Sequence, residues 1–129
     1  MDDDKDITCA MIVIENLKMI NLKSTVKLQN LLVIADQLIH EEVAKYLINN
    51  LTTSIRETLL EAQLCCQLTD NQFMGLVYAG LITGGVNWSA VPRMVEQYKS
   101  KVHVLKRLQC KLEAFHFTSD AAKWILDNL

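Results

Sequence analysis

The chain has 129 residues, of which 50% are hydrophobic and 22% are charged. This composition indicates one globular domain over residues 1–129 and excludes an intrinsically disordered chain. The net charge of −2 produces no overall positive potential that would attract nucleic acid. The sequence also has no apolar run of about 18 residues, so no membrane span is predicted.

Glycine and proline are scarce, with four and one residues respectively, which is too few for the turns of a β-sandwich or barrel. An all-α fold, a compact bundle of about seven helices, is therefore the prediction. Residues 1–6 are acidic and are expected to form a frayed, solvated start; they lack the basic region of a signal peptide. Residues 7–20 form an apolar element, predicted to be a helix because its β-branched run, 12–14, has no apparent partner strand.

A longer helix is predicted over residues 26–48. Its apolar positions follow helical spacing and are Leu28, Leu31, Leu32, Ala35, Leu38, Ile39, Val43 and Tyr46. Ser24 or Thr25 can serve as its N-cap. Residues 49–50 mark a joint, and a capping residue at 52, 53 or 54 can begin the next helix, whose apolar stripe reaches Cys66.

The second half of the chain repeats this pattern of caps and apolar stripes. Thr69 or Asp70 can cap a helix that ends at Gly84, because glycine adopts the left-handed conformation easily. Apolar spacing then predicts either one helix over 90–114 or two helices that meet near Ser100. Residues 118–120 can cap a last short helix.

The sequence carries little that indicates catalysis. His40, His103 and His116 are scattered outside any known zinc spacing, and no phosphate-binding loop or nucleophile elbow is present. The four cysteines, Cys9, Cys65, Cys66 and Cys110, are predicted to be free, buried thiols rather than disulfides. We therefore expect no enzyme activity, no metal and no cofactor.

Basic residues gather between positions 99 and 111. They are Lys99, Lys101, His103, Lys106, Arg107 and Lys111, and on a helix they lie away from the apolar stripe. The simplest interpretation is a solvated face. The alternatives are a surface for anionic lipid or for an acidic partner.

Two short motifs resemble those of a known family. Gly84-Gly85-Val86-Asn87-Trp88 resembles the first homology motif of the Bcl-2 family of apoptosis regulators, at a tight corner between helices. Residues 124–128, WILDN, resemble the start of the second motif, and the two occur in the family's order. The resemblance implies an all-α globule of seven or eight helices.

The chain departs from the first motif after its tryptophan. Ser89 stands where the family has glycine, and Ala90 stands where it has the arginine that pairs with an aspartate of the bound helix. Arg93 is the nearest positive charge, and Pro92 favours Ser89 as the N-cap. Brevity and the lack of an apolar tail suggest a viral homologue.

The resemblance implies an anti-apoptotic protein that binds the amphipathic death segment of a pro-apoptotic relative in an apolar groove. Because Ala90 stands in the arginine position, a narrow range of partners is expected unless Arg93 substitutes. The groove is expected between helices near 51–66, 70–82 and 88–98. Its candidate residues are Leu60, Leu64, Phe73, Leu76, Val77, Val86, Asn87, Trp88 and Arg93. The alternative is a scaffold of the same fold without a working groove, acting as a homodimer or on a host signalling adaptor. A cytoplasmic location that includes the mitochondrial surface is expected.

Overall fold

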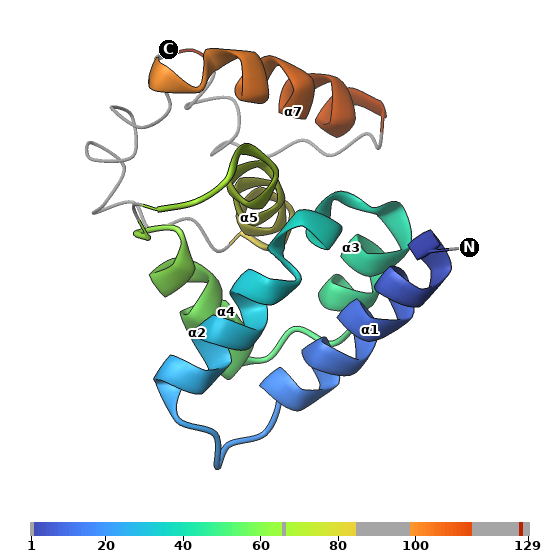
Figure 1. The fold of residues 1–129 in the computed structure, drawn as a ribbon, viewed down its shortest axis with the longest axis vertical. Helices are drawn as coiled ribbons and strands as arrows, with labels where there is room; N and C mark the ends of the chain where they lie inside the picture. Colours follow the sequence, from blue (N-terminus) through green and yellow to red (C-terminus); the bar gives the residue numbers. More distant parts are fainter. Residues whose placement is uncertain (1, 66, 85–98, 115–126, 128–129) are drawn as a thin grey trace.

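Helices make up the architecture of the computed structural model, which describes residues 2–65, 67–84, 99–114 and 127 (Figure 1). The elements are α1 (Asp2–Leu17), α2 (Ser24–Val33), the 3₁₀-helix η1 (Ala35–Ile39), α3 (Glu41–Asn49), α4 (Thr53–Ala62), α5 (Asp70–Thr83) and α7 (Val102–Ala114). The predicted all-α fold is confirmed.

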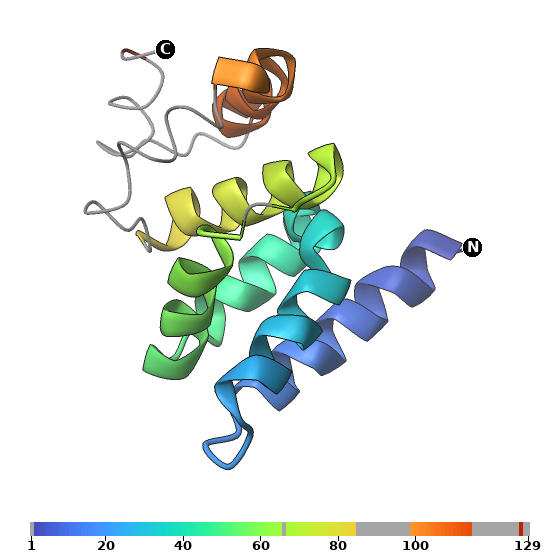
Figure 2. The ribbon, with the colours of Figure 1, turned by 60° about the vertical axis from the view of Figure 1, so that its left-hand side comes forward.

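Helix α5 lies in the middle of the molecule. Figures 1 and 2 show α1–α4 and η1 packed on one side of it, and α7 lying across the other side. One cluster of contacting buried side chains comes from α1–α4, η1 and one face of α5. Its members are Ala10, Ile14, Leu17, Leu31, Ile34, Ala35, Leu38, Val43, Leu47, Ile55, Leu59, Ala62, Leu76 and Ala79. We call α1–α4 with η1 the body.

The prediction of a single helix over residues 26–48 is wrong. The chain leaves α-helical geometry at Ile34, which has φ −105° and ψ 5°, and again at His40, which has φ −73° and ψ 135°. The 3₁₀ turn between these points carries the Ala35 carbonyl to within 1.7 Å of where a side-chain Cβ would stand on Gly75. Contact with α5 therefore occurs where the periodic stripe bends, and hydrophobic spacing alone does not reveal such a bend.

Some of the helix ends are those predicted from the sequence, and others differ from the prediction. Thr52 caps α4 by accepting from the Ile55 N–H at 3.2 Å, as predicted. Gly84 ends α5 with φ 70°, also as predicted. In the acidic start, α1 begins at Asp2, and residues 4–6 are exposed. Neither Ser24 nor Thr25 caps α2, because Lys23 occupies the N-cap position without a side-chain bond.

The residues around Ser100 decide between the two helix arrangements predicted for 90–114. Residues 99–100 are helical, Lys101 is a turn, and α7 begins at Val102, so an unbroken helix over 90–114 is wrong and a break lies near Ser100. The segment before residue 99 and the last predicted helix, at 118–125, lie outside the described residues.

The cysteine prediction was correct about pairing but not about burial. Cys9, Cys65 and Cys110 are free, yet Cys9 and Cys110 are exposed and Cys65 is half-buried. Cys66 lies outside the described part of the chain. Cys110 lies two residues after the buried Leu108, which puts it on the other side of α7, and Cys9 is turned away from the buried side chain of Ala10 beside it in α1.

Candidate partner-binding surface

Helix α5 has two faces that contact different parts of the molecule. Its nine residues from Phe73 to Leu81 are all buried, so neither face is open to solvent along that stretch. The inner face packs on the body and consists of Gln72, Gly75, Leu76 and Ala79. Gln72 donates from Nε2 to the Leu32 carbonyl at 3.2 Å.

The outer face of α5 is the set of residues that helical spacing turns away from the body. It consists of Asp70, Phe73, Met74, Val77 and Leu81, at positions i, i+3, i+4, i+7 and i+11. The four apolar members are at most 5% exposed, whereas Asp70 is exposed. Among the described helices, α7 is the one that crosses this side of α5 (Figure 2).

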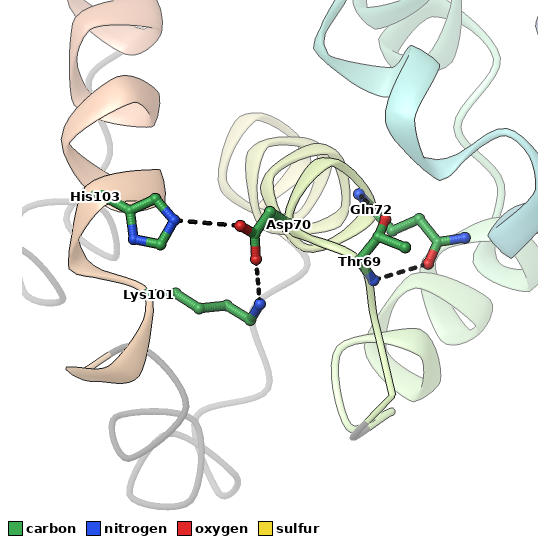
Figure 3. Close-up of polar contacts among 5 residues, drawn as sticks. All are labelled: Thr69, Asp70, Gln72, Lys101 and His103. Carbon is green, nitrogen blue, oxygen red and sulfur yellow. Dashed lines mark hydrogen bonds and ion pairs between the residues drawn. The ribbon is translucent and has the colours of Figure 1, made fainter.

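Asp70 connects α5 to α7 at the start of both helices. Its carboxylate accepts from Lys101 Nζ at 2.5 Å through one oxygen and contacts His103 Nε2 at 3.2 Å through the other (Figure 3). The hydrogen bond from Lys101, and then that from His103, hold the pKa of Asp70 below its ordinary value. Asp70 also stands in the first turn of α5, where the helix dipole favours a negative charge.

The N-terminus of α5 is organised by its own side chains. Thr69 accepts from the Gln72 N–H at 3.1 Å, and Gln72 Oε1 accepts from the Thr69 N–H at 3.1 Å, which forms a complete capping box (Figure 3). This capping box fixes the first turn that carries Asp70. The N-cap prediction for Thr69 or Asp70 is thus confirmed for Thr69.

Helix α7 is an amphipathic helix whose apolar side is used against α5. Val104 and Leu108, four residues apart, are 0% and 2% exposed. Lys101 holds its ammonium 5.7 Å from the centre of the Phe73 ring, a cation–π distance. The opposite side of α7 carries the exposed residues Lys106, Arg107 and Cys110. The prediction of a solvated basic face therefore holds for Lys106 and Arg107, but not for Lys101.

The predicted groove residues divide among several places. Phe73 and Val77 share the outer face of α5, and Leu60 and Leu64 are half-buried near the end of α4. Leu76 is on the inner face and belongs to the core of the body, so it cannot line one surface with Phe73. The remaining four candidates lie outside the described residues; these are Val86, Asn87, Trp88 and Arg93.

A polar side chain is buried where α4 meets α5. Gln63, the C-cap of α4, is 5% exposed, and its Oε1 has no hydrogen-bond partner among the residues that the structure describes. Its Nε2 lies 1.9 Å from where a Cβ on Gly80 would stand. Gly80 thus makes room for an amide that sits between the two helices.

Sequence reasoning missed the role of three residues: Asp70, Lys101 and His103. Asp70 was considered only as a cap, and the other two were assigned to a solvated face. The sequence does contain one indication for Lys101. It stands three residues before Val104, and this helical spacing puts it on the same side as the buried face of α7. That spacing identifies the face of α7, but only the fold shows that Asp70 opposes it.

Comparisons of the chain with known proteins found no match. No family model, no curated protein and no solved structure matches the chain. Within the residues the structure describes, His, Cys, Asp and Glu do not gather in a group of three that could hold a metal ion. None of the described helices combines the length and apolarity needed to cross a bilayer.

Proposed function

We propose that this protein binds an amphipathic helix of another protein, and that the helix is the death segment of a pro-apoptotic relative of the Bcl-2 family. The activity is then anti-apoptotic sequestration. The family assignment rests on the sequence motifs at 84–88 and 124–128. The physical part of the proposal, the recognition of a helix, rests on the outer face of α5.

The observation that carries the proposal is the way α7 lies on α5. The outer face of α5 is apolar from Phe73 to Leu81 and is crossed by an amphipathic helix, α7, whose buried side chains Val104 and Leu108 stand four residues apart. Helix-in-groove recognition uses the same spacing of apolar anchors. A surface that accommodates α7 therefore has the shape and the apolarity that a partner helix needs.

One feature differs from what the resemblance implies. The family's central helix is strongly apolar, and the resemblance places it after the first motif, at about residues 93–113. Here the central apolar helix is α5, which ends at Thr83, before that motif. For this reason the proposed function depends on the outer face and not on a one-to-one match of helices.

Calorimetric titration of the purified chain with a panel of death-segment peptides of about 25 residues tests the proposal. We expect submicromolar binding to at least one peptide. Val77→Glu, on the outer face, should weaken that binding at least about tenfold, since a charge would replace an apolar contact. Ile48→Glu is a surface control for the added charge, because Ile48 is 37% exposed on α3, which belongs to the body, whereas Val77 is 5% exposed.

The controls separate binding from folding. Circular dichroism of both variants should show the helix content of the parent chain. Absence of binding to every peptide would refute the death segment as the ligand. Equal losses from Val77→Glu and Ile48→Glu would refute the outer face as the site.

A further inference from the structure

From the residues that hold α7, we infer that the outer face of α5 selects a basic amphipathic helix, with a lysine or arginine placed three residues before its first apolar anchor. This inference rests on the proposed function in one respect, because it names the partner chemistry of the same surface. Its reasoning is independent of the family motifs. It uses only the contacts among α5, Lys101 and α7.

The outer face has one charge, and that charge is negative. Asp70 stands at the end of the apolar row that begins with Phe73. Its carboxylate binds Lys101 Nζ, just before α7, and His103 Nε2, in the first turn of α7. An incoming helix that covers Phe73 must place some side chain beside Asp70. A cation there gains the pairing that Lys101 has now, whereas an acidic residue there would be repelled.

Helix α7 shows the spacing that the surface accepts. Lys101, Val104 and Leu108 stand at i, i+3 and i+7; the first contacts Asp70 and Phe73, and the other two are buried. The same pattern on another chain would reproduce both the ion pair and the apolar contact. The partner that the surface fits therefore carries a sequence of the form cation-x-x-apolar-x-x-x-apolar.

The contact between α7 and α5 combines buried apolar side chains with solvated charged ones. Its paired side chains are accessible to water, since Lys101 is 24% exposed, Asp70 50% and His103 65%. Solvated ion pairs add little to stability and compete with water and salt. The body, in contrast, is joined to α5 through buried contacts and a close backbone approach at Gly75. A partner helix can thus take the place of α7 while the body stays folded.

The test uses the full-length chain with Leu108→Ala, which weakens the resident helix. The probe is a synthetic peptide with the sequence of residues 99–114, KSKVHVLKRLQCKLEA, and a second peptide in which the lysine corresponding to Lys101 is glutamate. Fluorescence anisotropy of labelled peptides gives the dissociation constants. We expect the first peptide to bind about tenfold more tightly than the second, because the charge beside Asp70 is reversed.

The second half of the experiment reverses the charge on the protein instead of on the peptide. Asp70→Lys, added to Leu108→Ala, should reverse the preference so that the glutamate peptide binds better. Asp70→Asn should abolish the preference, and it tests the same pairing if the lysine variant does not fold. Glu57→Lys is the matched control, since Glu57 is exposed on α4 and the substitution changes net charge equally; it should leave the preference unaltered.

Three results would overturn the inference. They are equal affinity for both peptides, a preference unaffected by Asp70→Lys, and exclusion of the peptide by a dimer seen in gel filtration, which would make a second copy the occupant. The panel of death segments separates this inference from the proposed function. If the panel binds and the basic peptide does not, the inference fails alone; if only the basic peptide binds, the death-segment proposal fails alone.

Discussion

The two faces of α5 are attached to the rest of the molecule in different ways. The inner face meets η1 so closely that Gly75 has no room for a side chain, and Leu76 and Ala79 lie in the core of the body. The outer face meets a single described helix, α7, with solvated charged groups at one end of the contact. One helix thus combines a face with close buried packing and a face that we propose exchanges its partner helix.

The largest expected effect belongs to Gly75 on the inner face. Gly75→Ala places a Cβ 1.7 Å from the Ala35 carbonyl oxygen, which is backbone and cannot move aside cheaply. We expect the free energy of unfolding to fall by about 3 kcal/mol, at the upper end for overpacked cores, as measured by urea denaturation. Gly80→Ala is the control, because its Cβ meets the flexible Gln63 side chain; it should cost less than about 1 kcal/mol. Similar losses of stability for the two variants would contradict the expected difference between a Cβ that meets backbone and a Cβ that meets a flexible side chain.

Tyr78 provides the second test, at alkaline pH. This residue is fully buried, and burial, followed by the negative charge of Glu41, raises its pKa to about 12 from an ordinary value of 10.0. The folded chain then keeps its proton while the unfolded chain loses it, so stability is complete below pH 10 and falls as the pH rises towards 12. The loss should reach roughly 2 kcal/mol.

Chemical denaturation at several pH values measures this loss. Tyr78→Phe should remove most of the alkaline dependence. Tyr46, whose pKa is also raised, by its hydrogen bond to Glu15, is exposed to solvent around that bond and should contribute less. An alkaline profile that Tyr78→Phe leaves unchanged would show that another group causes it.

The third test concerns the capping box, which stabilises the first turn of α5, the helix that carries both faces. Thr69→Ala removes the acceptor of the Gln72 N–H and should cost about 1 kcal/mol in thermal or urea unfolding. Thr69→Ser keeps the hydroxyl and should recover most of this stability. If serine performs no better than alanine, the hydroxyl is not what stabilises this helix end.

The smallest effect is expected at Asp70, on the outer face. Because the pKa of Asp70 is lowered, its pairing with Lys101 and His103 contributes above pH 3.8 and is lost as the pH falls through the lower, folded pKa. Amide chemical shifts of α7 followed by NMR should change in that acid range. In Asp70→Asn these changes should vanish, with little effect on the unfolding of the body. Loss of the whole fold in Asp70→Asn would mean that the outer face is as permanent as the inner one.

Sequence reasoning succeeded where a local rule governs the structure. The caps at Thr52 and Thr69 and the left-handed end at Gly84 each depend on residues within one turn, so they could be predicted. It failed for the helix over 26–48, because the chain breaks at Ile34 beside a close contact between Ala35 and Gly75, which is about forty positions further along the chain. For the candidate site, it found Phe73 and Val77 as apolar positions of one helix, but it also included Leu76, which points the other way.

The amino-acid sequence by itself determined that this is an all-α protein and which residues begin and end several of its helices, because periodicity, capping and glycine conformation act over a few residues. The tertiary structure alone decided that α5 is the centre, that η1 interrupts the second helical stretch, and that Asp70 faces Lys101 and His103. These features join residues some thirty or forty positions apart. Such pairs are set by how whole helices pack, and a local pattern carries no record of that packing.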